Sequence, residues 1–251
     1  MRLLSGLVAL GTTCVLGGCS SGDDVYIETT ATRSGLCELS RGEDVCARSW
    51  SHVPVESRPE AVSWLQTIVT FSSEARTMLD ELDAACTEML GSLGVNAPVL
   101  EDHTTRAGSA VTNCQTASEA IRARRTTKLE LVELEGPSCE NVPGPSCVLP
   151  LPPPQRVCTP ARVTLERAAS PADAELATAI TPAFGRVAMT MERTEQLVDL
   201  SARITSMTRS DVQLALPECL VVNATSLASE ASAEAKVAVE IVGDLSAALE
   251  R

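Results

Sequence analysis

The ten cysteines are the residues of this chain that could do the most chemistry. Thiols bind zinc, act as nucleophiles or pair as disulfides, and their spacing helps to tell these uses apart. No two cysteines stand in a Cys-x-x-Cys pattern, and none lies in a close cluster with a histidine. A zinc site is therefore not indicated, and disulfide pairing in an oxidising compartment is the main expectation.

Other catalytic signals are weak. Only two histidines are present, His52 in a stretch flanked by tryptophan and proline, and His103 beside Glu101 and Asp102 at an expected helix start. Capping or solvation explains both more simply than general base catalysis. The sequence contains no Gly-x-Ser-x-Gly, His-Glu-x-x-His, phosphate-loop or calcium-loop pattern. We therefore expect no catalytic residue, no metal ligand and no cofactor.

The amino terminus indicates export. Met1 and Arg2 precede fourteen apolar or small residues, LLSGLVALGTTCVL, a run too short and glycine-rich to span a bilayer core of about 30 Å comfortably. The run ends in Leu16-Gly17-Gly18-Cys19, which resembles the lipobox of bacterial lipoproteins. That resemblance implies cleavage after residue 18 and acyl chains such as palmitate on Cys19, which would hold the protein on a membrane. An uncleaved helix and an ordinary signal with a chance cysteine are the alternatives.

Export also bears on the remaining cysteines. If Cys14 leaves with the signal and Cys19 carries lipid, an even set of eight remains, namely Cys37, Cys46, Cys86, Cys114, Cys139, Cys147, Cys158 and Cys219. An even set in an oxidising compartment predicts disulfides, but it does not define which cysteines pair.

Charge and composition exclude several functions. The chain has 33 acidic and 20 basic residues and a net charge of −13, and removal of residues 1–18 takes away one arginine and no acid. Such a surface repels phosphate backbones and anionic headgroups, so we expect no nucleic-acid partner and a membrane contact through lipid alone. Only 2% of residues are aromatic, which disfavours a β-sandwich core or an aromatic sugar-binding platform.

Hydrophobic periodicity divides the mature chain in two. Residues 19–57 are polar and turn-rich and predict a tether followed by a Cys37/Cys46 segment, whereas residues 58–251 predict one disulfide-stapled helical domain. Apolar residues spaced three and four apart indicate helices over about 59–93, 103–126, 171–209 and 217–249. Caps precede two of them, in Ser57-Arg58-Pro59-Glu60 and Ser170-Pro171-Ala172-Asp173.

The sequence also makes three more detailed predictions about these helices. Pro182 and Gly185 should kink or interrupt the third helix. Glu234 is the one charged interruption of the last apolar seam, and we expect it at the rim of the bundle because burying an unpaired carboxylate is costly. Residues 94–102 should form the turn of an antiparallel hairpin that places Cys86 within about one turn of Cys114, and we predict a disulfide between them.

The period changes to two between residues 127 and 166. Alternating apolar residues in TKLELVELEG and VCTPARVTLE predict two short strands of a β-ribbon, joined by a proline-rich loop that Cys139, Cys147 and Cys158 would staple. A polyproline ligand is the alternative reading of that loop. The predicted fold is mainly α, with four long helices as two antiparallel hairpins and the small two-stranded ribbon between them.

One basic cluster stands out, Arg122, Arg124 and Arg125 in IRARRTTK. It could dock an acidic partner or a cell-wall polymer, but Glu119 and the acidic body favour pairing inside the protein. The triplet Asn223-Ala224-Thr225 fits the acceptor pattern for asparagine glycosylation, and we interpret it as a chance match.

The overall organisation resembles uncharacterised lipoproteins of myxobacterial type: a lipobox, two helices, a cysteine- and proline-bearing segment with CTPARVTLE, and two more helices. The resemblance implies the envelope of a Gram-negative bacterium, and it carries no activity and no catalytic residue.

The expected function is a non-enzymatic scaffold or interaction module at the outer membrane, with an envelope protein as its partner. One alternative is a periplasmic carrier of a hydrophobic small molecule in the bundle interior. A second is a hydrolase of envelope polymers that uses paired carboxylates with separately shifted pKa values. The sequence does not distinguish a monomer from a dimer.

Overall fold

A computed structural model of the chain describes residues 37–98, 105–142, 155–166, 170–207, 212 and 215–250. The described chain is mainly helical with a small amount of two-stranded antiparallel sheet, as the sequence predicted. Its helical elements are the 3-10 turn η1 (Val45–Ala47), α2 (Arg58–Ser92), α3 (Arg106–Arg124), α4 (Pro171–Met207) and α6 (Glu218–Glu250). Its strands are β1 (Glu130–Glu135), β2 (Ser138–Val142), β3 (Gln155–Thr159) and β4 (Arg162–Glu166).

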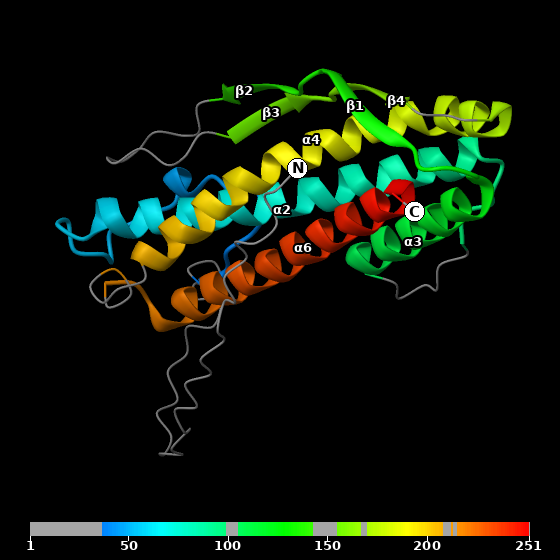
Figure 1. Cartoon of the computed structure of the whole chain (residues 1–251). Coiled ribbons are helices and arrows are strands. Elements are labelled where there is room, and N and C mark those ends of the chain that lie inside the picture. The colour runs from blue at the N-terminus through cyan, green and yellow to red at the C-terminus, as the bar shows by residue number, and fades with distance from the viewer. Residues whose placement is uncertain are drawn as a thin grey trace.

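Helix α2 is the central element of the molecule (Figure 1). Pro59 lies in its first turn, where the missing N–H of proline removes no intrahelical hydrogen bond. At about 1.5 Å per residue, its 35 residues extend roughly 50 Å. Helices α4 and α6 both pack along α2, and its apolar side chains are buried against them.

Ion pairs seven residues apart define how α4 lies along α2. Glu74 pairs with Arg193 at 2.5 Å, and Arg186 contacts both Glu81 at 3.1 Å and Glu88 at 3.5 Å. The α2 residue numbers rise as the α4 numbers fall, so these two helices are antiparallel. The side chains of Glu74 and Arg193 are only 7% and 6% exposed, so the interface contains a buried ion pair.

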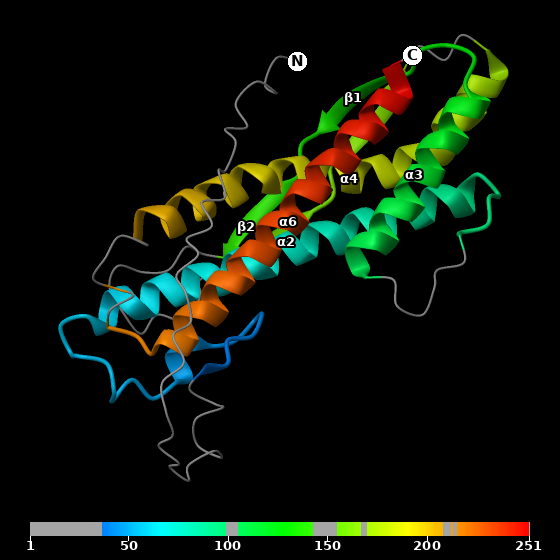
Figure 2. The ribbon, with the colours of Figure 1, turned by 90° about the horizontal axis from the view of Figure 1, so that it is seen from below.

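Helix α3 runs in the same direction as α2, so the predicted antiparallel hairpin between the first two helices is wrong (Figure 2). Arg106 near the start of α3 pairs with Asp80 at 3.0 Å, and Cys114 further along is bonded to Cys86, so residue numbers rise together on both helices. Thirteen residues, 93–105, separate α2 from α3. A chain of that length can extend about 40 Å, which is enough to return along α2 before the next helix begins.

Helices α4 and α6 run in opposite directions (Figure 1), but each packs more extensively on α2 than on the other. Packing is therefore organised around α2. Helix α4 continues through Pro182, so of the two predicted outcomes, a kink or an interruption, the interruption does not occur. A proline removes one helical hydrogen bond, while Ala183, Phe184 and Val187 beside it are buried in the core that includes α2 and hold the helix in place.

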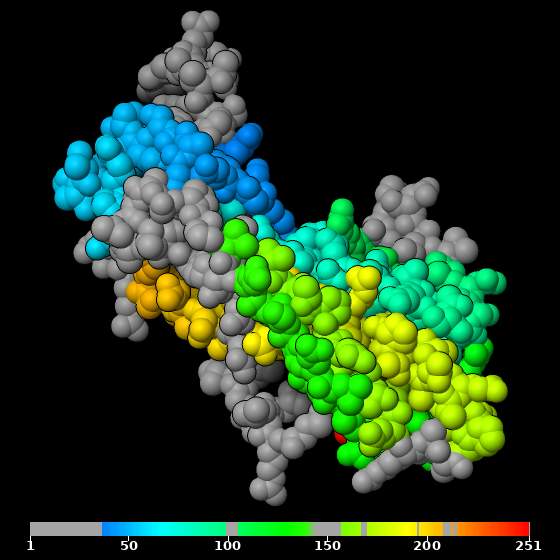
Figure 3. All heavy atoms as spheres, turned by 90° about the horizontal axis from the view of Figure 1, so that it is seen from above, coloured from blue at the N-terminus to red at the C-terminus, as the bar shows by residue number. Residues whose placement is uncertain are grey.

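The β-ribbon lies along α4 (Figures 1 and 3). Strand β1 pairs antiparallel with β4, and β2 pairs antiparallel with β3. Val163 and Leu165 on β4 are buried in the core that includes α4, and the Ala161 N–H donates to the Gly185 carbonyl at 3.1 Å. A Cβ on residue 185 would lie 2.3 Å from the Ala161 oxygen, so this close approach requires glycine. The proline-rich stretch 143–154 lies outside the described residues.

Residues 37–57 pack onto the end of the bundle where α2 and α6 begin. Val45, Trp50 and Val53 are buried there in a core shared with α2 and α6. The first part of the expected tether, up to residue 36, lies outside the described residues. None of the described helices has the length and hydrophobicity needed to span a membrane.

Glu234, which we expected at the rim of the bundle, is half-buried beside this segment and is not unpaired. Its side chain is 12% exposed and pairs with the guanidinium groups of Arg41 and Arg76. Two cations offset the cost of burying this carboxylate. Arg41 comes from the segment before α2, so the periodicity of the last helix alone could not indicate this partner.

Candidate interaction surface

Every described cysteine is disulfide-bonded. Cys86 joins Cys114 with Cα atoms 4.9 Å apart, which is the predicted pair, although it was predicted from an antiparallel hairpin and the helices that carry it run parallel. Two further bonds join the ends of the described chain and the two strands of the ribbon, Cys37–Cys219 and Cys139–Cys158. Cys46 is also disulfide-bonded. Cys19 and Cys147 lie outside the described residues.

The histidines show no catalytic arrangement within the described chain. The His52 ring lies 6.0 Å from that of Trp50, measured between centroids, and its side chain is exposed. His103 lies outside the described residues. Among the described residues, no group of three or more histidine, cysteine, aspartate or glutamate side chains is placed to hold a metal ion.

Two described carboxyl groups have shifted pKa values, and they lie far apart in the sequence and in the fold. Burial acts to raise the pKa of Glu43, but the hydrogen bond from Arg48, the Ser40 N–H and the Arg48 charge outweigh it and lower that pKa. The pKa of Asp173 is also lowered, by hydrogen bonds described below. A glycosidase needs one carboxyl group with a raised pKa beside an ionised one, and these two groups do not form such a pair.

A shallow groove of about 230 Å³ lies between α3 and α6. Val111, Val237 and Ile241 supply its apolar part, and Glu240 and Asp244 supply two carboxylates. Pockets for small hydrophobic ligands are usually larger and more enclosed. The groove therefore gives the carrier alternative no specific support.

The termini of three helices meet at one corner of the molecule, where α3 ends, α4 begins and α6 ends (Figures 1 and 2). Asp173, in the first turn of α4, accepts hydrogen bonds from the Thr126 N–H at 2.7 Å, the Thr126 hydroxyl at 2.5 Å and the Thr127 hydroxyl at 2.9 Å. Ser170 adds a hydroxyl donor at 2.9 Å and in turn accepts from the Asp173 N–H. This carboxylate thus ties the segment after α3 to the start of α4.

These donors hold Asp173 in its charged form. The hydroxyl and N–H of Thr126 lower its pKa most, and Ser170 and Thr127 add to the effect, so the pKa lies well below the usual range although burial opposes it. The residue is fully buried. A buried, ionised carboxylate with this many donors is a rigid structural joint.

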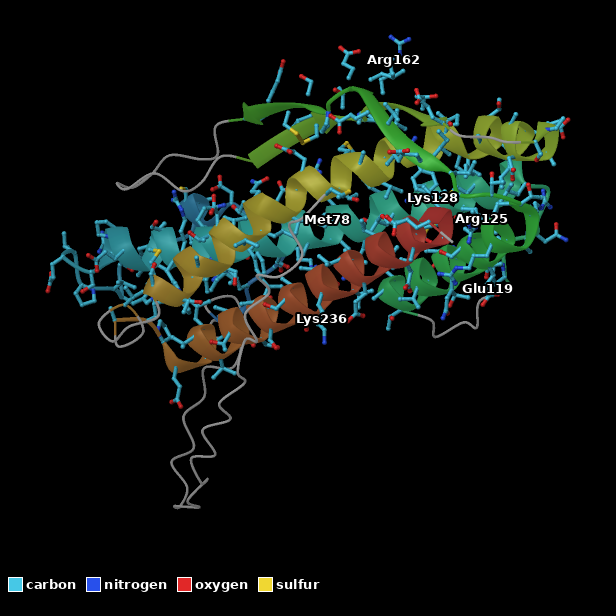
Figure 4. All side chains as sticks on the ribbon, viewed as in Figure 1. Met78, Glu119, Arg125, Lys128, Arg162 and Lys236 are labelled. Carbon is cyan, nitrogen blue, oxygen red and sulfur yellow. A yellow bond between two sulfur atoms is a disulfide. The ribbon has the colours of Figure 1, made fainter. Side chains whose placement is uncertain are left out.

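Four cationic residues lie close in the sequence to Thr126 and Thr127, which donate to Asp173. Arg122, Arg124 and Lys128 are exposed and Arg125 is half-buried, and Figure 4 shows Arg125 and Lys128 beside the end of α6. Within the described residues none of the four forms an ion pair, and the one side-chain hydrogen bond among them goes from Arg122 to the Asp244 carbonyl oxygen at 3.4 Å. The Arg125 Nε and Nη1 atoms are shielded and have no acceptor. The expected pairing with Glu119 or the acidic body is therefore not found.

We call these four residues, Arg122, Arg124, Arg125 and Lys128, the basic corner. The sequence identified its three arginines, and the Ser170-to-Asp173 spacing indicated a helix cap. No local sequence pattern could predict the hydrogen bonds from Thr126 and Thr127 to Asp173, because the acceptor lies about 46 residues further along the chain.

No protein-family model, curated protein or solved structure matches this chain.

Proposed function

We propose that the protein is a lipid-anchored scaffold or interaction module of the cell envelope, held in the outer membrane of a Gram-negative bacterium by acyl chains on Cys19. The observation that carries this proposal is that every described cysteine is disulfide-bonded. Structural disulfides persist in oxidising compartments, so the bonds support the export that the first nineteen residues indicate.

The attachment of the amino-terminal segment adds geometric support. Cys37 is bonded to Cys219 at the start of α6, and its carbonyl accepts a hydrogen bond from the Asn223 amide. An anchor at Cys19 would therefore connect to the end of the bundle where α2 and α6 begin. Residues 20–36 could span at most about 60 Å. The basic corner, at the other end of α2, would then be presented away from the anchor (Figure 1).

The intact mass of protein purified from bacterial membranes tests the anchor. We expect a chain that starts at Cys19 and carries acyl chains, with cysteines that react with an alkylating reagent only after reduction. A mass that includes residues 1–18, or free thiols without reduction, would contradict the proposal.

The same preparation gives a second test through its disulfide map. Under the proposal Cys14 is removed and the Cys19 sulfur carries lipid, so Cys147 is the one cysteine left to pair with Cys46. Peptide mapping without reduction should therefore recover a Cys46–Cys147 peptide. A Cys46–Cys19 peptide would exclude lipid on Cys19.

A further inference from the structure

We propose that the basic corner binds an anionic, carboxylate-bearing polymer of the cell envelope. This inference rests on the proposed function, because it names the partner that the anchored scaffold would engage.

None of the four cations of the basic corner forms an ion pair with a carboxylate of the described residues. Several arginines elsewhere in the described chain face carboxylates at short distances, as in the pairs Arg193–Glu74, Arg106–Asp80 and Arg186–Glu81. The four cations of the basic corner have no such partner there, although acids outnumber bases in the whole chain by 33 to 20. An acidic protein that leaves one cluster of cations unpaired presents a local attraction for anions.

The backbone of the basic corner is held in place by hydrogen bonds to the rest of the bundle. Thr127 on one side of Lys128 is held by Asp173, and the Leu129 N–H on the other side donates to the Leu249 carbonyl of α6 at 3.0 Å. Arg125 is held by its own backbone N–H, which donates to the Ile121 carbonyl at 3.0 Å. A fixed backbone reduces the ordering that a partner must impose when it binds.

The composition and the position of the basic corner indicate the kind of anion that it binds. Three of the four cations are arginines, whose planar guanidinium groups bind carboxylates and phosphates alike with two parallel hydrogen bonds, so the choice between these anions rests on where the corner lies. A membrane surface is disfavoured, because the corner lies at the opposite end of α2 from Cys37, where the anchored tether would enter (Figure 1). The net charge of −13 repels a polyanion from the rest of the surface, so a flexible polymer that reaches only the corner fits better than a broad charged sheet.

Co-sedimentation with purified peptidoglycan sacculi tests the proposal. The mature full-length protein, kept in detergent, is compared with a double variant of the corner, Arg124→Glu with Lys128→Glu. The matched control is Arg162→Glu with Arg203→Glu, which changes the net charge equally at two exposed arginines that form no ion pair among the described residues. Arg162 lies on β4 (Figure 4), and Arg203 lies near the end of α4. Thermal melting of both variants establishes that they fold.

We expect the wild type to sediment with sacculi and the corner variant to bind at least about tenfold more weakly, while the control stays within about twofold of wild type. Roughly 0.5 M salt should release the wild type, because screening shortens the range of exposed charges. Equal loss in both variants, no wild-type sedimentation, or binding to phosphatidylglycerol vesicles in place of sacculi would overturn the proposal. Sacculus binding does not require the lipid, so this outcome is independent of the mass measurement at Cys19.

Discussion

Asp173 shows how one side chain joins parts of the chain that are distant in sequence. Its carboxylate is buried, and donors from Thr126, Thr127 and Ser170 compensate the loss of water around it. The same donors lower its pKa, so the group is ionised in the folded protein at neutral pH. Removing the charge would leave several buried donors without a strong acceptor.

The variant Asp173→Asn should lower the melting temperature by several degrees at pH 7, because the amide cannot accept from all of these donors. It should also flatten the acid limb of the stability curve. In the wild type the folded pKa is lowered, so the unfolded chain takes up the proton first, at about pH 4, and stability is lost as the pH falls further. Melting curves between about pH 7 and pH 2 measure both effects.

The control for this variant is Asp199→Asn on the same helix, where the carboxylate is exposed and forms no side-chain hydrogen bond or ion pair among the described residues. It should leave both the melting temperature and its pH dependence nearly unchanged. Parallel pH curves for wild type and Asp173→Asn would show that this carboxylate does not carry the predicted stability.

The contact between the ribbon and α4 depends on a residue without a side chain. Strand β4 begins beside α4, where the Ala161 N–H donates to the Gly185 carbonyl and the two backbones touch. Glycine normally weakens a helix by about 1 kcal/mol relative to alanine. Glycine is nevertheless required at this position, because a Cβ would lie only 2.3 Å from the Ala161 oxygen.

Gly185→Ala should therefore destabilise the protein by about 1–3 kcal/mol, the usual cost of overpacking, and loosen the ribbon. Gly243→Ala in α6 is the matched control, since a Cβ there would meet nothing within 4 Å. That change should stabilise the protein by up to about 1 kcal/mol through helix propensity. Denaturant unfolding measures both free energies, and faster amide exchange in residues 130–142 would localise the first effect. Equal effects of the two substitutions would contradict the role assigned to Gly185.

Across the whole molecule, the Cys37–Cys219 bond closes almost the entire described chain into one loop. The bonded residues are 182 positions apart, compared with 19 for Cys139–Cys158 in the ribbon. Arg41, which binds Glu234 and the Ser72 carbonyl, reinforces the same closure without a covalent bond. The segment that leads to the proposed anchor is thus part of the folded body.

Replacing Cys37 and Cys219 by alanine should destabilise the protein by about 2–5 kcal/mol, as for other native disulfides of small exported domains. The Cys139→Ala, Cys158→Ala pair should cost about 2 kcal/mol less, because the entropy of closing a loop grows with its length. Urea unfolding compares the two variants, and limited proteolysis should cut residues 37–57 faster only in the first. A larger loss from the ribbon pair would show that strain or local packing outweighs loop closure.

Local signals in the sequence predicted the four long helices well. The ends of the four helices lie within three residues of the predicted ranges, since apolar spacing, caps and proline positions act over one or two turns. Strands β1 and β4 fall in the two predicted strand segments, where apolar residues alternate, but β2 lies in the stretch predicted as a proline-rich loop, because its pairing with β3 is not a local property. The three arginines of the basic corner were visible because they lie close together in the sequence.

How these elements combine depends on contacts between segments that are distant in the sequence. Periodicity shows which face of a helix is buried but not the direction of its partner, so the sequence alone could not reveal that α3 runs parallel to α2. The partners of Glu234 and Asp173 come from segments distant in the chain, and no local pattern encodes them. The unpaired charge of the basic corner is also a tertiary property, since a cation is neutralised or left free by whatever the fold places beside it.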